Sequence, residues 1–402
     1  MDLIEHEALF LVNRIEAFLS GTSGTLGSMN IATRSKLSEA ARRLNLATET
    51  SGDTIQRIML SPLQLPLTVV GIETRLFEVL SKANGRMIDK QELSIVTKIN
   101  PVLLKRLLRY YQAFGMLDQL GDDHYQANNM TSAISSPGGR NALPFYFEAV
   151  VPALNAIPRC LRDNAYQNVT YGECFPWYVG HQTNKEIYEW MKDHPSALHH
   201  FMSYMVRQRD GQHTFLDVVD FREFTKSVVS KNTPVFVDIG GSLGHQCVAL
   251  RQKYPDLVGR VILQDSEEVI EQARIHPIPG FEGIEAQVHD FFTPQPIKGA
   301  RTYYMRNILH NWPDDKCIEI LKNIKSAMTQ ESRILIDEMV FPESDVHWRA
   351  AQLDLVMGSC FGSMGRTQQD WDTLFEKSEL EVLKVWKYTA NLDDCVIVAV
   401  PK

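Results

Sequence analysis

The stretch from Val235 to His245, Val-Phe-Val-Asp-Ile-Gly-Gly-Ser-Leu-Gly-His, constrains the fold more than any other part of the chain. A run of β-branched and aromatic residues ends in a glycine cluster, and a helical pattern follows over 246–253. The pattern predicts a strand, a tight turn and a helix, because glycine adopts positive φ and lets a ligand approach the backbone. The N–H groups at the start of such a helix favour an anionic group.

A second predicted strand, 260–264, ends in Asp265, which is placed to accept hydrogen bonds from a ribose. The glycine turn lacks the dinucleotide spacing and carries an acid, Asp238, at the strand end. A carboxylate there would repel a pyrophosphate but suits a cationic or amino-bearing ligand. The chemistry therefore favours S-adenosylmethionine over NAD, because this cofactor carries an amino group, a sulfonium and a ribose. The alternative is an ordinary strand, turn and helix that bind nothing.

The composition is that of a soluble globular protein with two or three domains, at 402 residues with 44% hydrophobic and 22% charged residues. A net charge of −8 argues against a large nucleic-acid surface, which is normally basic. The six cysteines form no CxxC pair, so reduced thiols are expected rather than disulfides or a metal site. We see no apolar run of about eighteen residues and no signal peptide, and we expect a cytoplasmic protein without a membrane segment.

Residues 1–135 are expected to form an N-terminal helical and winged-helix domain. The predicted helices cover 3–19, 31–45, 73–82, 90–97 and 101–114. A predicted hairpin with Gly-Asp-Asp at its turn follows the last of them. The last helix could bind DNA through Lys105, Arg106 and Arg109, but such bases usually form a solvated face. The apolar first helix favours dimerisation instead, and a homodimer is the assembly we predict.

Residues 136–230 look helical throughout and are expected to form a connector that lines the substrate pocket. Its middle is rich in aromatic residues: Tyr166, Tyr171, Phe175, Trp177 and Tyr178. Over 231–402 the pattern alternates between strand and helix, which predicts an α/β domain with a Rossmann-like, doubly wound parallel sheet. The predicted strands cover 234–239, 260–264, 286–289, 302–305, 333–339, 381–388 and 395–400, and the last two resemble an antiparallel edge hairpin.

Two further stretches carry candidate chemistry. Asp290 follows the third predicted strand and would lie at the ligand edge of the sheet. Arg306, His310 and Trp312 follow the fourth. A histidine at this edge, beside a cofactor loop, is a candidate general base, and a structural histidine under a loop is the alternative.

Several motifs occur in one order along the chain: Gly-Gly-x-x-Gly-His at 240–245, the later Asp265, Asp-Phe-Phe at 290–292, Leu-His-Asn-Trp-Pro-Asp-Asp-Lys-Cys at 309–317 and Gly-Arg-Thr-x-x-x-Trp at 365–371. Together they resemble the caffeic-acid-type class I O-methyltransferases of plants and fungi, and most of all the fungal secondary-metabolism branch. The resemblance runs from about residue 65 to the end. It implies a catalytic domain that uses S-adenosylmethionine, a small-molecule substrate and a winged-helix dimerisation domain.

The resemblance also implies roles for individual residues. The cofactor contacts it implies, together with Asp238, are Gly240, Gly241, Gly244, Asp265, Asp290, Phe291 and Arg306. The catalytic candidates are His310 as base, Glu338 as a carboxylate that orients it, and Arg306. The substrate-binding candidates are Phe201, Met205, Asn307, Asp354 and Met357.

Two positions depart from the family pattern. Gly365 stands where the family usually has a second orienting glutamate, and Asn311 stands where it usually has aspartate. Without these carboxylates His310 loses partners that hold its tautomer and stabilise its charged form. The departures open a second interpretation, in which the chain resembles the leporin-type pericyclases. Those enzymes keep the bound cofactor without consuming it, and here Arg306 and Asn307 would contact a substrate carbonyl.

Overall fold

The structure is a computed structural model, and it describes residues 3–21, 29–168, 174–207, 213–226, 230–389 and 393–402. The chain separates into two compact units, 1–67 and 68–402, and each is described by itself. Residues 22–28, between the first two predicted helices, lie outside the described residues. The three-part division of the chain stays a prediction, because the second unit holds the hairpin, the connector and the large sheet together.

The first unit is helical. It contains α1 (Leu3–Gly21), α2 (Ile31–Thr48), α3 (Ser51–Leu60), a 3₁₀ turn (Ser61–Leu63) and the start of α4 (Gln64–Glu73). The first two helices confirm the predicted ones, whereas α3 and α4 were not predicted. A capping box fixes the start of α3, because Thr50 and Asp53 each accept a hydrogen bond from the other's backbone N–H.

The segment Ser51–Glu73 is long and apolar enough to cross a membrane by length and composition alone, with a mean hydropathy of 1.2. This differs from our expectation that the chain has no such segment. Only 17% of the stretch is buried within the protein. Helices of soluble proteins that pack against a core or a partner satisfy the same test, so the finding is weak evidence for a membrane.

The second unit begins with short helices around a small antiparallel sheet of order β1-β3-β2. Its elements are α5 (Leu76–Lys82), β1 (Ile88–Asp89), α6 (Lys90–Thr97), α7 (Pro101–Ala113), β2 (Asp118–Leu120), β3 (His124–Gln126) and α8 (Asn129–Ser135). Asn100 caps α7 by accepting a hydrogen bond from the N–H of Val102 at 2.9 Å. Helices α6 and α7 and the hairpin β2–β3 confirm the predictions, and α5 begins at Leu76 rather than at residue 73. Strand β1 and helix α8 were not predicted.

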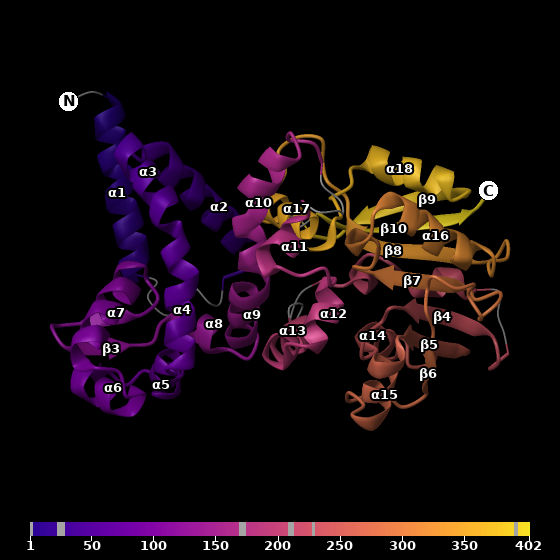
Figure 1. Ribbon diagram of the computed structural model, residues 1–402, viewed down its shortest axis with the longest axis horizontal. Coiled ribbons are helices and arrows are strands. Elements are labelled where there is room, and N and C mark those ends of the chain that lie inside the picture. The colour runs from indigo at the N-terminus through magenta and orange to yellow at the C-terminus, as the bar shows by residue number, and fades with distance from the viewer. Residues whose placement is uncertain (1–2, 22–28, 169–173, 208–212, 227–229, 390–392) are drawn as a thin grey trace. The chain divides into compact units, whose positions relative to one another are not determined.

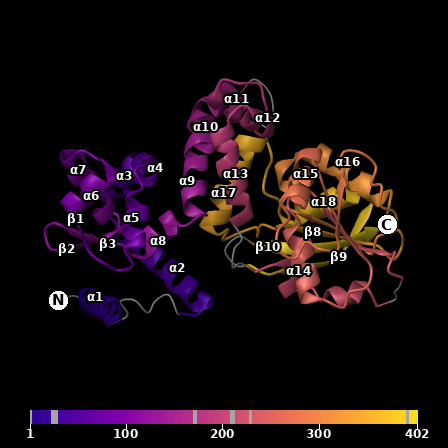
Figure 2. The same cartoon turned by 90° about the horizontal axis from the view of Figure 1, so that it is seen from below.

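The connector is helical throughout its described residues, as predicted. It comprises α9 (Gly139–Phe145), a π-helical turn (Tyr146–Val150), α10 (Val151–Asp163), α11 (Pro176–His181), α12 (Ile187–Lys192), α13 (Pro195–Arg207) and 3₁₀ turns at Phe215–Asp217 and Phe221–Phe224. The later helix α17 (Trp348–Phe361) packs with α10 and α11, as Figure 1 and Figure 2 show. The chain therefore returns from the large sheet to complete the connector.

The large sheet has seven strands in the order β6-β5-β4-β7-β8-β10-β9. Its strands are β4 (Pro234–Ile239), β5 (Arg260–Asp265), β6 (Ile284–Val288), β7 (Thr302–Arg306), β8 (Arg333–Met339), β9 (Leu380–Lys387) and β10 (Asp394–Pro401). The first five are parallel, and β10 pairs antiparallel with both β8 and β9. The predicted parallel sheet and antiparallel edge hairpin are both confirmed.

Helices cover both faces of this sheet (Figure 1). One face packs on α16 (Asp314–Lys325) and α18 (Gln368–Lys377), and the other packs on α14 (His245–Lys253) and α15 (Glu267–Ile275). Because β4 to β8 are parallel, the loops that follow them meet at one edge of the sheet, where ligands bind in doubly wound folds.

Candidate active site

The glycine turn after β4 is shaped by backbone geometry. Gly240 has φ +69° and donates its N–H to the carbonyl of Gln264 at 2.8 Å. A Cβ on Gly240 would lie 2.5 Å from Cδ1 of Ile308. Gly244, with φ +85°, precedes the first residue of α14. The turn therefore requires glycine at both positions, and it leaves the backbone close to the space a ligand would use.

Asp265 lies beside this turn and is held in place by the backbone. Its two carboxylate oxygens accept hydrogen bonds from the N–H groups of Ser242 and Ser266, each at 2.8 Å. Burial raises the pKa of Asp265, and these two N–H groups oppose the rise. A fixed carboxylate at the end of the second strand fits the ribose-binding role predicted for it.

The predicted adenine contacts lie after β6. Asp290 is exposed, and its Oδ1 accepts the N–H of Phe292 at 2.9 Å. The ring of Phe291 lies 4.0 Å from the place of a Cβ on Gly240, and its centroid is 6.2 Å from that of Trp312. The structure thus brings Phe291 to the glycine turn.

Asp238 lies beneath the turn. It is 1% exposed, and a Cβ on Gly241 would come within 2.5 Å of its carboxyl carbon. Burial raises the pKa of Asp238 to about 7, and the Cys247 thiol, 3.6 Å from Oδ2, acts in the opposite direction. Its carboxyl group supports the turn from behind, and direct contact with the cofactor stays a prediction.

His310 sits on the 3₁₀ turn Leu309–Asn311, which follows β7. Its Nδ1 is 3.6 Å from Oε2 of Glu338, and its backbone N–H donates to Oε1 at 3.3 Å. Burial raises the pKa of Glu338 to about 8, because the carboxyl group is almost wholly removed from water. The structure therefore brings the predicted base and one orienting carboxylate together.

Arg366 fixes this turn, a role that we did not predict. Its buried guanidinium donates to the carbonyls of Leu309 and Trp312 at 3.0 and 2.9 Å, and to the Asp314 carboxylate at 2.9 and 3.0 Å. The Gly-Arg-Thr motif was the available signal, but nothing in the sequence indicated which carbonyls the arginine reaches. Arg366 and Asp314 hold the residues on either side of His310.

The space beside Gly365, where the family places a second carboxylate, is filled by Phe341. A Cβ on Gly365 would lie 1.5 Å from Cε2 of the Phe341 ring. The Gly365 N–H donates to Oδ1 of Asp354 at 2.5 Å, which places this predicted substrate residue against the backbone. The other departure, Asn311, donates from Nδ2 to the carbonyl of Asn307 at 3.1 Å and so bridges the loop after β7.

Arg306 ends β7 within a buried polar network. Its Nε lies 3.5 Å from Oδ2 of Asp337, and this carboxylate accepts hydrogen bonds from the hydroxyls of Tyr304 and Tyr388 at 2.5 and 2.6 Å. Burial lowers the pKa of Arg306, but Tyr304 and Asp337 outweigh it and the net direction is upward. Within the described residues, Nε and Nη2 of Arg306 are buried without a hydrogen bond. The sequence did not indicate that Asp337 and the two tyrosines join Arg306.

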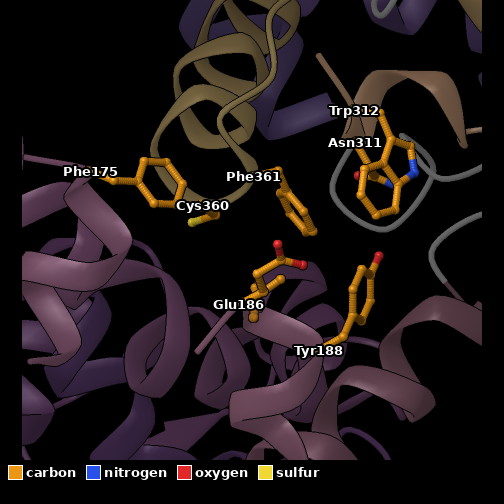
Figure 3. Close-up of a pocket in the computed structure, with 8 residues that line it drawn as sticks. Phe175, Glu186, Tyr188, Asn311, Trp312, Cys360 and Phe361 are labelled. Atoms are coloured by element: carbon orange, nitrogen blue, oxygen red, sulfur yellow. The ribbon is translucent and has the colours of Figure 1, made fainter. Parts of the chain in front are cut away.

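An open pocket lies between the connector and the His310 turn (Figure 3), and its empty volume of about 300 Å³ includes solvent at its opening. Its lining combines apolar and aromatic walls with a few polar groups: Phe175, Glu186, Ile187, Tyr188, Asn311, Trp312, Cys360 and Phe361. Tyr188 keeps 42% of its surface accessible, yet surrounding protein desolvates its hydroxyl and raises its pKa to about 12, with a smaller effect from Asp265. Tyr188 therefore lines the pocket with a ring that is partly accessible and a hydroxyl group that is desolvated.

None of the five predicted substrate residues is among the described residues that line this pocket. The ring of Phe201 lies 6.0 Å from that of Tyr188. Met205 and Met357 are partly buried on α13 and α17 but do not line the pocket. Asn307 adopts φ +53° in the loop after β7 and contacts Asn311 through its carbonyl.

The five aromatic residues noted in the middle of the connector lie in different environments. Phe175 lines the pocket, whereas Trp177 is fully buried in the helical core and Tyr178 packs against Phe175 with ring centroids 5.0 Å apart. Tyr166 is 75% exposed, and Tyr171 lies outside the described residues. Glu186 and Tyr188 were not predicted, because no motif marks them.

The doubly wound sheet, the glycine turn with its acid on the next strand, and a histidine–carboxylate pair at the same edge define a class I methyltransferase with a helical N-terminal region. The chain matches the model of the O-methyltransferase domain over residues 167–379. It belongs to this family, and its members are enzymes that use S-adenosylmethionine.

Relatives and solved structures agree with this membership. The chain is 34% identical to O-methyltransferase UcdC of Aspergillus ustus, over 92% of this chain and 95% of the relative. It is 35% identical to demethylsterigmatocystin 6-O-methyltransferase of Aspergillus parasiticus, over 90% of this chain and 91% of the relative. A solved complex of LepI with S-adenosylmethionine and a structure described as a pericyclic reaction enzyme each give a TM-score of 0.90 at 31% identity, over 97% of this chain and 100% of theirs.

Proposed function

We propose that the protein transfers a methyl group from S-adenosylmethionine to a hydroxyl of a fungal secondary metabolite with an aromatic or polyketide-like skeleton. The observation that carries this proposal is the pair formed by His310 and Glu338 at the carboxyl edge of the sheet. The relatives named above, which act in fungi, support the substrate class.

The residues around the glycine turn fit this cofactor. Gly240 and Gly244 leave the backbone open, Asp265 offers oxygens to ribose hydroxyls, and Phe291 offers a ring face to adenine. When bound, S-adenosylmethionine supplies an electrophilic methyl group on a sulfonium.

The chain's own residues perform the proton transfer. With the Nδ1–H of His310 directed to Glu338, Nε2 is the acceptor that removes the proton from the acceptor hydroxyl. The ionised carboxylate then stabilises the imidazolium, as in other histidine–carboxylate pairs. Positioning of the reactants supplies most of the acceleration, and the base contributes a further ~10²–10⁴-fold.

The test is His310→Ala, with His276→Ala as the matched control, because His276 is an exposed residue at the end of α15. We expect His310→Ala to abolish methyl transfer while the cofactor dissociation constant, measured by calorimetry, stays within a few-fold. Methylation that survives the change would refute the assignment of the base.

A second candidate is a pericyclase that binds the cofactor without consuming it. Two observations favour it: the buried Nε and Nη2 donors of Arg306, and the aromatic ring of Phe341 in place of a second carboxylate. Hydrogen bonds from Arg306 to a developing negative oxygen would strengthen in a dry pocket. In that case Arg306→Ala would cost more activity than His310→Ala, and mass spectrometry would detect product without demethylated cofactor.

We also propose that the protein is a homodimer built on a winged-helix N-terminal region, and that it does not bind nucleic acid. Large apolar side chains are exposed on the first unit, including Phe10 at 58%, Ile55 at 64% and Met59 at 63%, and a partner would bury them. Light scattering that gives a monomer at micromolar concentration would contradict the dimer. The free cysteines of the structure suit the reducing cytoplasm, where we propose that the protein acts.

A further inference from the structure

Glu186 is an exposed residue that lines the pocket. It is the N-cap residue of α12, yet its side chain accepts no hydrogen bond from that helix. Figure 3 shows the carboxylate directed into the pocket, between Tyr188 and Phe361. The neighbouring cation, Lys185, pairs with Asp193 at 2.5 Å. Within the part of the chain that the structure describes, the Glu186 carboxylate has neither a hydrogen bond nor an ion pair, so helix capping does not account for its direction.

Aromatic rings form the walls around this charge. The rings of Tyr188 and Phe361 lie 5.8 Å apart, and Phe175 and Trp312 complete the wall. The face of an aromatic ring is negative and attracts cations, most strongly where water is partly excluded. A carboxylate among such rings favours a positively charged guest and opposes an anionic one.

A second hydrogen-bond acceptor in the pocket also favours a positively charged ligand. The amide nitrogen of Asn311 already donates to the carbonyl of Asn307, so its Oδ1 is the atom that can face the pocket. Two acceptors, Glu186 and Asn311, match the N–H donors of an ammonium group. Asn311 and Trp312 directly follow His310, so the pocket adjoins the turn that carries the proposed base.

We propose that this pocket binds a protonated amine of the methyl acceptor, with Glu186 as its counter-charge and as a determinant of substrate specificity. The inference rests on the proposed function and names the acceptor class: hydroxylated aromatic compounds that carry a basic nitrogen. Because the cofactor is also cationic, the experiment must separate the two ligands.

The experiment measures binding by calorimetry to the full chain loaded with demethylated cofactor. The probes are tyramine and its uncharged isostere 4-propylphenol, which differ only in the charged nitrogen. We expect the wild type to bind the amine about 5-fold more tightly, because an ion pair with an exposed carboxylate contributes up to about 1 kcal/mol. Glu186→Gln should remove this preference. The matched control Glu189→Gln should keep it, because Glu189 is exposed on the same helix but does not line the pocket.

Three results would overturn the proposal. They are equal binding of both probes to the wild type, a preference for the amine that survives Glu186→Gln, and a Glu186→Gln variant in which only the affinity for the cofactor falls. The last result would mean that the carboxylate serves the cofactor. Selective amine binding without any methyl transfer would instead refute the proposed function and leave this inference standing.

Discussion

The close contact between Gly365 and Phe341 gives the sharpest quantitative prediction. Gly365 has no positive φ, so its backbone tolerates a side chain and only the Phe341 ring opposes one. A methyl group at 365 would lie 1.5, 2.3 and 2.7 Å from three ring carbons, well inside normal contact at about 3.5–4.0 Å. The ring is 9% exposed and packs with Met339, Ala350 and Leu353, so it has little room to move.

Gly365→Ala should therefore lower the free energy of unfolding by about 3 kcal/mol, at the upper end of overpacking effects. Phe341→Ala should lower it by about 4 kcal/mol through the cavity it leaves. In the double variant the new methyl group enters that cavity, so we expect a loss of about 4 kcal/mol rather than the roughly 7 of independent changes.

Urea titrations followed by tryptophan fluorescence measure these values. Gly52→Ala is the control, since its Cβ would meet no atom closer than 3.8 Å and helix propensity favours alanine. A Gly365→Ala variant as stable as the wild type would refute the steric argument, and so would losses that add in the double variant.

Four further predictions concern the site. Arg366→Ala should destabilise the protein by about 3–5 kcal/mol and reduce kcat, because Asp314 and the carbonyls of Leu309 and Trp312 lose a buried partner. An unchanged free energy of unfolding would contradict the role of Arg366. Asp265→Asn should weaken cofactor binding about 10- to 100-fold in calorimetry, and unaltered affinity would exclude the ribose contact. Methyl transfer should rise with pH between about 6 and 9, because burial raises the pKa of Glu338 to about 8 and only the ionised carboxylate orients His310. A flat pH profile of the wild type would contradict this, and so would a Glu338→Gln variant with the same pH profile as the wild type. Because folding raises that pKa from 4.5, the stability contributed by protonated Glu338 is lost as the pH rises toward 8, so Glu338→Gln should be the more stable protein in alkaline urea titrations.

The sheet and its glycine turn could be predicted because both depend on local sequence. Runs such as Val235–Val237 carry β-branched and aromatic residues, and the glycines that follow permit the turn. The same holds for the edge hairpin, which β9 and β10 form. The pairing of His310 with Glu338 followed from the family motif and not from any pattern in these residues.

The other parts of the site depend on contacts between distant segments, and no local pattern encodes them. Phe341 fills the space at Gly365 across a loop, and Glu186 comes from the connector to face Asn311. Helix α3 was missed although its sequence held the signal, since Ile55, Ile58 and Met59 stand at helical spacing after the Thr50 cap.

The contacts of Arg366 also bear on the order in which the protein folds during synthesis. The ribosome makes the His310 turn more than fifty residues before it makes this arginine, since Arg366 and Leu309 are 57 positions apart. Until then the carbonyls and carboxylate around the turn lack their main donor. The backbone hydrogen bonds of the glycine turn run to Gln264 on β5, which is made early, whereas the catalytic turn must wait for the C-terminal segment to emerge and dock.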